Sequence, residues 1–247
     1  MATFASMAFY ESISDLYDFI FPLNPAQTGF VKTCFTEFGQ KTILDVGCGT
    51  GNLSIALSTD CKEIYGIDPD LSMLEIAKEK AGRDHPNLHF SPHGMLDIAP
   101  QFSDIDAILC FGNTMVHLSS ETEVSDFLQQ ARKALTPRGK LLVQIINYDR
   151  ILDKAIQGLP GIENDKISFV RRYNYLPAEN SIEFETTLTI KDNGQQIHNL
   201  IHLLPIRKSS LDVLLKNAGF KSVKYYGNFK KDALTSDSVP LVFEAGT

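Results

Sequence analysis

A glycine-rich stretch over residues 42–53 constrains the fold of this chain more than any other part of its sequence. An apolar run ends at Asp45, and Gly47, Gly49 and Gly51 follow at alternate positions. A helical pattern of apolar residues begins directly after the last glycine, so the stretch predicts a strand, a tight turn and a helix. Glycine accepts positive φ and has no Cβ, so a ligand can lie against the bare amides of such a turn and the helix N-terminus.

Two acidic residues indicate what that ligand carries. Asp45 ends the first strand, where the pyrophosphate of a nicotinamide dinucleotide would lie, and two anions repel each other in a poorly solvated crevice. Asp45 therefore disfavours a nicotinamide-dependent oxidoreductase and favours positive charge on the ligand. Asp68 ends the next apolar run, about twenty residues after the glycines, where an acid can accept hydrogen bonds from both hydroxyls of a ribose. An ammonium beside Asp45 and a ribose beside Asp68 together describe S-adenosylmethionine.

On these residues the chain resembles the class I S-adenosylmethionine-dependent methyltransferases. Their first motif is similar to residues 45–51, and their second motif ends in an acid like Asp68. The resemblance implies an α/β fold with a doubly wound, seven-stranded, Rossmann-like sheet whose last strand is reversed. It also implies S-adenosylmethionine as cofactor, S-adenosylhomocysteine as product, and a set of cofactor-binding residues: Asp45, Gly47, Cys48, Gly49, Gly51, Asp68, Pro69, Met73, Met95, Leu96 and Phe111.

The loop before the predicted fourth strand departs from the family pattern. The family usually has an acid at the position of Gly94, followed by a residue whose backbone amide meets the adenine ring. Met95 and Leu96 can still supply backbone contacts, but the usual side-chain contact to the adenine amino group is missing. Asp97 is expected to replace that acid only if the loop shifts by several ångströms.

Residues 111–118 and 147–152 extend the resemblance to the glycine N-methyltransferases and the glycine/sarcosine N-methyltransferases. Residues 111–118 follow the fourth strand, where ligands of open α/β sheets bind, and they lack the Asn/Asp-Pro-Pro-aromatic signature of nucleic-acid amino-methyltransferases. The expected reaction is therefore methyl transfer to the nitrogen of an amino acid or small amine. O-methylation of a small metabolite, and S-adenosylmethionine binding without catalysis, are the alternatives.

Three residues are candidates for the catalytic step. The resemblance implies that Asn147 helps to hold an amino acid substrate and that the N-terminal helices bring Tyr17 over the cofactor. The amine must attack in its neutral form, so its proton leaves on binding or through Tyr17 or His117. Tyr17 could instead be a core aromatic residue, and His117 could be a structural contact at the start of a helix.

Three further residues are candidates for binding the acceptor. Tyr10 precedes Tyr17 at helical spacing, and Asn113 lies in the loop after the fourth strand. Arg171 and Arg172 are adjacent in a predicted strand, so at most one of them faces the pocket. An inward Arg171 would bind a carboxylate, whereas two solvated charges on an edge strand are the alternative.

Composition limits the remaining possibilities. The net charge of −7 argues against nucleic-acid binding, because that binding depends on clustered Lys and Arg, and a small-molecule acceptor is expected instead. Four singly placed cysteines, the absence of an apolar run of membrane-spanning length and an N-terminus without a basic leader predict a cytoplasmic protein without membrane contact. His85, His89 and His93 recur every four residues, but prolines interrupt any helical face, so no metal is expected.

The pattern along the chain predicts one domain over residues 1–247. Its parts are an N-terminal helical cap over residues 1–40, a cofactor-binding core over 41–150, a small antiparallel β insertion over 160–205, and a closing helix and hairpin over 206–247. Within these parts, the sequence predicts helices at about 8–21, 26–38, 71–82 and 121–135, a turn at 137–139 before a strand at 140–146, and three strands in the insertion. Ser120 with Glu123, and Ser209, are the expected helix caps.

Overall fold

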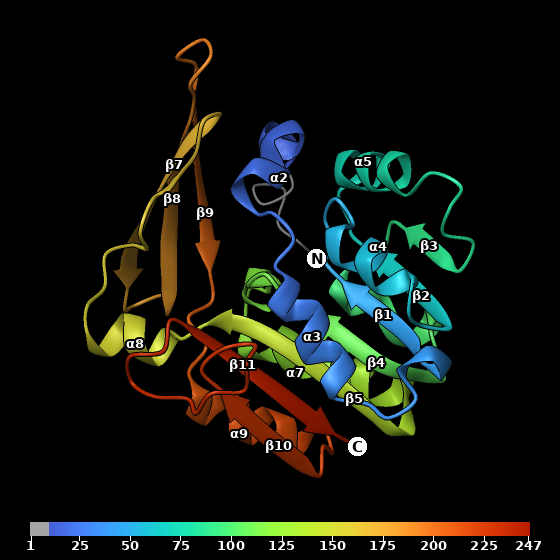
Figure 1. Cartoon of the computed structure of the whole chain (residues 1–247). Coiled ribbons are helices and arrows are strands. Elements are labelled where there is room, and N and C mark those ends of the chain that lie inside the picture. The colour runs from blue at the N-terminus through green and yellow to red at the C-terminus, as the bar shows by residue number, and fades with distance from the viewer. Residues whose placement is uncertain (1–9) are drawn as a thin grey trace.

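The computed structural model describes residues 10–247, and a twisted sheet of seven strands forms its centre (Figure 1). Six strands occur in the order β3-β2-β1-β4-β5-β11 and β10 completes the edge. β11 runs antiparallel to β5 and β10, whereas the other neighbours are parallel. The doubly wound seven-stranded fold with its reversed strand is therefore confirmed. The strands are β1 (Thr42–Val46), β2 (Glu63–Ile67), β3 (Leu88–Ser91), β4 (Ile105–Cys110), β5 (Leu135–Ile146), β10 (Ser222–Tyr226) and β11 (Pro240–Gly246).

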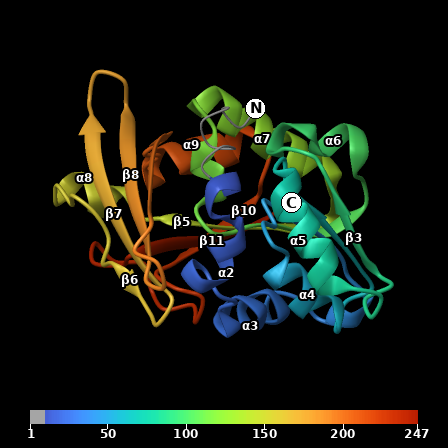
Figure 2. The ribbon, with the colours of Figure 1, turned by 90° about the horizontal axis from the view of Figure 1, so that it is seen from above.

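Helices cover both faces of this sheet (Figure 2). Ile43 and Leu44 are neighbours in β1, and they point to opposite faces because side chains alternate along a strand. Ile43 belongs to the core beneath α3 and α4, whereas Leu44 belongs to the core beneath α7 and α9. Both side chains are fully buried, as expected for a parallel strand covered on both sides. The helices are α3 (Pro25–Thr33), α4 (Asn52–Ser58), α5 (Leu71–Ala81), α6 (Ile98–Gln101), α7 (Glu121–Ala134), α8 (Tyr148–Asp153) and α9 (Lys208–Asn217).

A second sheet stands beside the core and forms one wall of the molecule (Figure 1). Three long antiparallel strands were expected here, and β7 (Ile167–Leu176), β8 (Ser181–Ile190) and β9 (Gln196–Leu203) confirm them. The expected number was wrong by one, because β6 (Ile162–Glu163) pairs with β7. Two residues are too few to produce a readable alternation of side chains, so β6 escaped the sequence pattern.

The N-terminal cap is more broken than the sequence pattern predicted. The first expected helix, at about 8–21, lies partly outside the described residues, and its described part is divided into helical residues 10–13, a 3₁₀ turn, η1 (Ser14–Leu16), and the short α2 (Tyr17–Ile20). The second, expected at 26–38, ends at Thr33. α2 lies against β7 of the second sheet and close to the glycine turn of the first. The cap therefore bridges the two sheets.

Two local predictions were wrong for identifiable reasons. The turn expected at 137–139 lies inside β5 (Leu135–Ile146). β5 pairs with β4 both at Leu135 and from Lys140 onward, and the residues between them form an irregularity in the strand. Ser209 does not cap α9: the helix begins one residue earlier, and Arg207 holds the cap position. Ser120 does accept a bond from the amide of Glu123, as expected.

Among residues 10–247, no helix is long and apolar enough to cross a membrane.

Candidate active site

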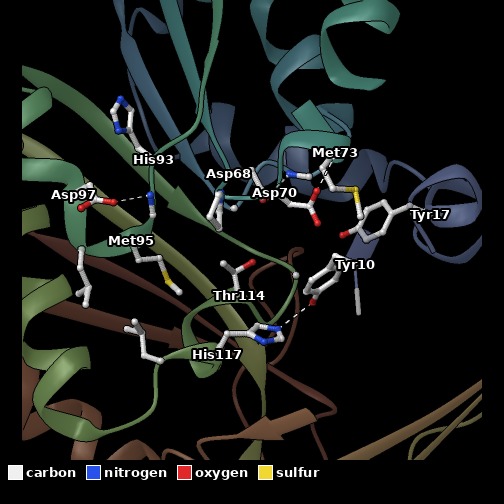
Figure 3. Close-up of a pocket in the computed structure, with 17 residues that line it drawn as sticks. Tyr10, Tyr17, Asp68, Asp70, Met73, His93, Met95, Asp97, Thr114 and His117 are labelled. Atoms are coloured by element: carbon white, nitrogen blue, oxygen red, sulfur yellow. Dashed lines mark hydrogen bonds between the residues drawn. The ribbon is translucent and has the colours of Figure 1, made fainter. Parts of the chain in front are cut away.

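Two adjoining cavities lie at the carboxyl ends of the central strands. The first has a volume of about 310 Å³ and the second about 960 Å³. Figure 3 shows the first, with Asp68 and Met73 on one side and Thr114 and His117 facing them. Six residues line both cavities and define what we call the junction: Tyr10, Tyr17, Gly47, Gly112, Thr114 and His117.

The glycine turn has the backbone that the sequence predicted. Gly47, Gly49 and Gly51 have φ values of +71°, +55° and +78°, in the region that side-chain-bearing residues rarely adopt. A Cβ at Gly47 would lie 2.4 Å from Cγ2 of Thr114, so no side chain fits between the turn and the loop after β4. Gly47 and Gly49 line the first cavity, whereas Gly51 packs against Phe90 and is not among the lining residues.

Asp45 lies at the second cavity, and a hydrogen bond from α4 fixes the orientation of its side chain. Its side chain is buried, and one carboxylate oxygen accepts a 2.6 Å hydrogen bond from Ser54 on α4. Burial raises the pKa of Asp45 to about 6, although the bond from Ser54 opposes the shift. The anion is therefore costly in its present surroundings, and a nearby cation would stabilise it.

Asp68 lies at the first cavity and is fixed by backbone amides. It accepts hydrogen bonds from the amides of Gly49 at 2.9 Å and Asp70 at 3.0 Å. These bonds couple the ends of β1 and β2, so the acid is held in place by the glycine turn itself. Burial raises the pKa of Asp68 to about 6 against the effect of both amides.

The loop at Gly94 brings an acid to the place where the family's acid is missing. Met95, Leu96 and Asp97 form the 3₁₀ turn η3 (Met95–Asp97) and line the first cavity. Asp97 folds back and accepts a 2.9 Å bond from the Gly94 amide. A Cβ at Gly94 would lie 3.3 Å from that oxygen, so the carboxylate stands beside the place where a side chain at position 94 would begin.

The junction contains a hydrogen-bonded Tyr–His pair. The hydroxyl of Tyr10 lies 3.0 Å from Nε2 of His117, and the rings meet edge to face at 5.5 Å (Figure 3). Burial lowers the pKa of His117 to about 4, so the imidazole is neutral at physiological pH. Its Nδ1 is buried without a hydrogen-bond partner among residues 10–247. The ring centroids of Tyr17 and Tyr10 lie 6.2 Å apart, and burial raises the pKa of both phenols.

A hydrogen-bond network that the sequence did not predict fastens the cap over the glycine turn. Asp18 of α2 accepts bonds from Thr50 at 2.6 Å and Asn52 at 2.8 Å. Its other oxygen forms an ion pair with Lys80 of α5 at 2.6 Å. One carboxylate thus ties the cap to both helices that follow the cofactor motifs.

The remaining candidates divide between cavity walls and structural positions. Phe111, Asn113 and Arg171 line the second cavity, while Arg172 is exposed on the opposite face of β7. Asn147 is not among the lining residues: it caps α8, and its Nδ2 donates to the carbonyls of Thr235 and Ser238.

The other candidates line at least one cavity, and so do residues that the sequence did not single out. Pro69 and Met73 line the first cavity, and Cys48 lines the second. The lining residues not predicted include Thr50, Asp70, His93, Gly112, Thr114 and Leu118.

Comparison with known proteins identifies the chain. Residues 43–139 match the family model of a methyltransferase domain. The chain is an S-adenosylmethionine-dependent methyltransferase. A methyltransferase of this family from Clostridium acetobutylicum has the same fold, with a TM-score of 0.81 and 13% sequence identity, over 96% of this chain and 98% of that one. The enzyme uses S-adenosylmethionine as its cofactor.

Named relatives of this methyltransferase act on different acceptors. A protein of Geobacillus sp. (strain WCH70) named as a methyltransferase is 28% identical, covering 96% of this chain and 98% of its own. The glycine/sarcosine N-methyltransferase of Aphanothece halophytica is 27% identical, covering 82% of this chain and 74% of its own. A tRNA U34 carboxymethyltransferase of Shewanella loihica is 31% identical over a shorter stretch, 62% of this chain and 44% of its own.

Proposed function

We propose that this methyltransferase transfers its methyl group to the nitrogen of a small-molecule amine of the amino-acid type. The observation that carries the proposal is Arg171, which lines the second cavity and has no carboxylate partner among the described residues. A partly buried cation without an anion is less stable than one with a partner, and the carboxylate of an amino acid would supply the missing charge. The named glycine/sarcosine N-methyltransferase relative supports the same acceptor type.

The two cavities fit the two ends of the cofactor. Asp68 would hold the ribose hydroxyls in the first cavity, where Met73 and residues 94–97 would enclose the adenine. Asp97 would then accept a bond from the adenine amino group in place of the acid absent at Gly94. Asp45 would stabilise the methionine ammonium at the second cavity, directly or through the glycine turn. This arrangement would bring the reacting methyl group to the junction.

The junction is suited to methyl transfer without a covalent enzyme intermediate. When bound, S-adenosylmethionine supplies an electrophilic methyl group: the amine nitrogen bonds to its carbon, the carbon–sulfur bond breaks, and the product ammonium then loses a proton. Holding the amine close, aligned and dry can supply most of the acceleration. With a pKa of about 4, His117 is a weak base, so we assign the His117–Tyr10 pair to orienting the neutral amine rather than to removing its proton.

A methyl-transfer screen tests this function. Labelled S-adenosylmethionine is incubated with the protein and a panel of amino acids, small amines and hydroxy acids, and both S-adenosylhomocysteine and methylated product are measured. We expect product only with amines, bearing the label on nitrogen. A label on oxygen would contradict the proposed acceptor atom, and methylated tRNA in a parallel incubation would contradict the small-molecule class.

Cofactor affinity should fall in mild acid. Asp45 and Asp68 both have a pKa near 6, and the ammonium and the ribose bind better to the ionised carboxylates, so below pH 6 each binding event must first remove a proton. We expect affinity for S-adenosylhomocysteine to be constant above pH 7 and to fall by up to about tenfold per pH unit for each group below pH 6. Calorimetric titration between pH 5 and pH 8 measures this. Adenosine has no ammonium and should show the shallower slope, so equal slopes would contradict the assignment of Asp45.

Releasing the cap should accelerate cofactor exchange. Asp18→Ala removes an ion pair and two hydrogen bonds between α2 and the motif helices. Since such contacts contribute about 0.5–1.5 kcal/mol each and act together here, we expect S-adenosylhomocysteine to dissociate about three- to thirtyfold faster. A chase of labelled ligand with excess unlabelled ligand measures the rate. Asp15→Ala is the matched control, because Asp15 is an exposed acid on the preceding turn. Equal rates in the two variants would show that the network does not hold the cap.

A further inference from the structure

The second cavity is much larger than a glycine substrate requires. Its volume is about 960 Å³, at the upper end of the range of drug-sized binding sites. At the roughly 30 Å³ that a water molecule takes up in the liquid, the five non-hydrogen atoms of glycine fill about 150 Å³ and the nine of the methionine part of the cofactor about 270 Å³. More than half of this half-open cavity lies beyond both.

The remaining space has apolar, aromatic walls. The face of the second sheet that looks into it carries Tyr173, Phe184 and Leu203, because alternate side chains of paired strands share one face. The rings of Tyr173 and Phe184 lie 5.5 Å apart. Phe21 of the cap also lines the cavity, and its ring centroid lies 5.2 Å from that of Tyr17 and 6.0 Å from that of Phe169 on the inner face of β7. The outer face of the same sheet is largely polar, whereas the inner face belongs to the main hydrophobic core and also borders the cavity.

The wall combines this apolar surface with one cationic group. The guanidinium of Arg171 donates a 2.5 Å hydrogen bond to the carbonyl of Pro160. Its Nε is buried without a partner in the described part of the chain. Tyr173 follows two residues later on the same face, about 7 Å along β7. An anionic group and a ring on one small molecule can therefore meet Arg171 and the Tyr173–Phe184 pair together. Asp232 and Lys230 also border the cavity, and Asp232 is bonded to Asn228.

We infer that the acceptor is an amine bearing both a carboxylate and a ring-sized apolar body, and that the enzyme discriminates against free glycine. The carboxylate would lie on Arg171, the apolar body against Phe184 and Phe21, and the amine at the junction. This inference rests on the proposed function for the amine and for the carboxylate on Arg171; the binding of the apolar body can be measured without turnover.

Three probes separate the contributions to acceptor binding. Protein saturated with S-adenosylhomocysteine is titrated calorimetrically with glycine, phenylalanine and 2-phenylethylamine. Because burying a side chain of that size strengthens binding by at least about tenfold, phenylalanine should bind at least tenfold more tightly than glycine. Phenylalanine should also bind at least about tenfold more tightly than 2-phenylethylamine, which lacks the carboxylate.

Variants of the second sheet assign this preference to its inner face. Phe184→Ala should weaken phenylalanine about tenfold and leave glycine unchanged, whereas Phe184→Leu, which keeps an apolar wall, should retain most of the affinity. Leu200→Ala is the matched control, because Leu200 is half exposed on the outer face of β9.

These results distinguish the apolar acceptor site from the proposed amine methylation. Glycine binding as tightly as phenylalanine, no phenylalanine binding at millimolar concentration, or equal effects of Phe184→Ala on both probes would overturn the inference and leave amine methylation in place. Tight phenylalanine binding with no methylation of any amine would instead contradict the proposed function and support the apolar site.

Discussion

Asp68→Ala should weaken binding of both S-adenosylhomocysteine and adenosine, whereas Asp45→Ala should weaken S-adenosylhomocysteine and leave adenosine nearly unchanged. Both ligands carry the ribose that we assign to Asp68, but only S-adenosylhomocysteine carries the ammonium that we assign to Asp45. Each substitution removes a charge-assisted contact worth about 1.5–3 kcal/mol, which corresponds to roughly tenfold to more than a hundredfold in affinity. Calorimetric titration of both ligands into both variants measures the difference.

Two controls keep this test specific. Asp60→Ala removes a surface carboxylate just after α4 that pairs with Lys32, and it should change neither affinity. Asp45→Asn retains an oxygen for the bond from Ser54, so a loss of affinity in that variant reports the missing charge rather than a disturbed turn. Unchanged S-adenosylhomocysteine affinity in Asp68→Ala would contradict the placement of the cofactor on which the site assignments rest.

Gly47→Ala should destabilise the fold and abolish cofactor binding. The residue has a φ of +71°, which costs alanine about 1–2 kcal/mol. The added Cβ would also lie 2.4 Å from Cγ2 and 2.9 Å from Oγ1 of Thr114, and such overpacking costs about 1–3 kcal/mol. We therefore expect the free energy of unfolding to fall by about 2–5 kcal/mol in urea denaturation. Binding should be lost because Gly47 and Thr114 both belong to the junction.

Two further variants separate backbone strain from the steric clash. Gly194 has nearly the same φ, +72°, in the β8–β9 hairpin, and a Cβ there meets no described atom within 4 Å. Gly194→Ala should therefore show the backbone cost alone. Adding Thr114→Ala to Gly47→Ala removes the nearest clashing atoms and should restore about 1–3 kcal/mol, a coupling that a double-mutant cycle isolates. Equal destabilisation by Gly47→Ala and Gly194→Ala would show that the loop yields and no clash exists.

The cofactor motifs could be predicted because they are local. A strand, three glycines and a helix specify their own backbone, and the positive φ values of the turn follow from the residue type. The same holds for the start of α5, where Asp70 caps the helix by accepting bonds from the amides of Ser72 and Met73. Residues within a few positions of one another settle such features before any distant contact forms.

Contacts between distant segments were beyond reach of the same reasoning. Asp18 meets Lys80 across 62 positions of chain, and Tyr10 meets His117 across 107. No sequence spacing predicts either pairing, because each depends on how the N-terminal cap packs between the two sheets. Asn147 shows the converse: the family pattern implies a substrate contact, but the loop from Thr235 to Ser238 supplies carbonyl partners that occupy its side-chain amide.

The sequence by itself determined the α/β class, the glycine turn and the two acids at the ends of β1 and β2, because backbone preference and side-chain alternation act over a few residues. Only the tertiary structure decided which side chains share a cavity. The 3₁₀ turn at residues 95–97 brings the carboxylate of Asp97 to the amide of Gly94. Arg171 rather than Arg172 faces the second cavity, because the pairing of β7 with β8 sets which alternate side chains point inward. The size and apolar character of the acceptor cavity belong to this second group, since they arise where the cap, the loop after β4 and the second sheet meet.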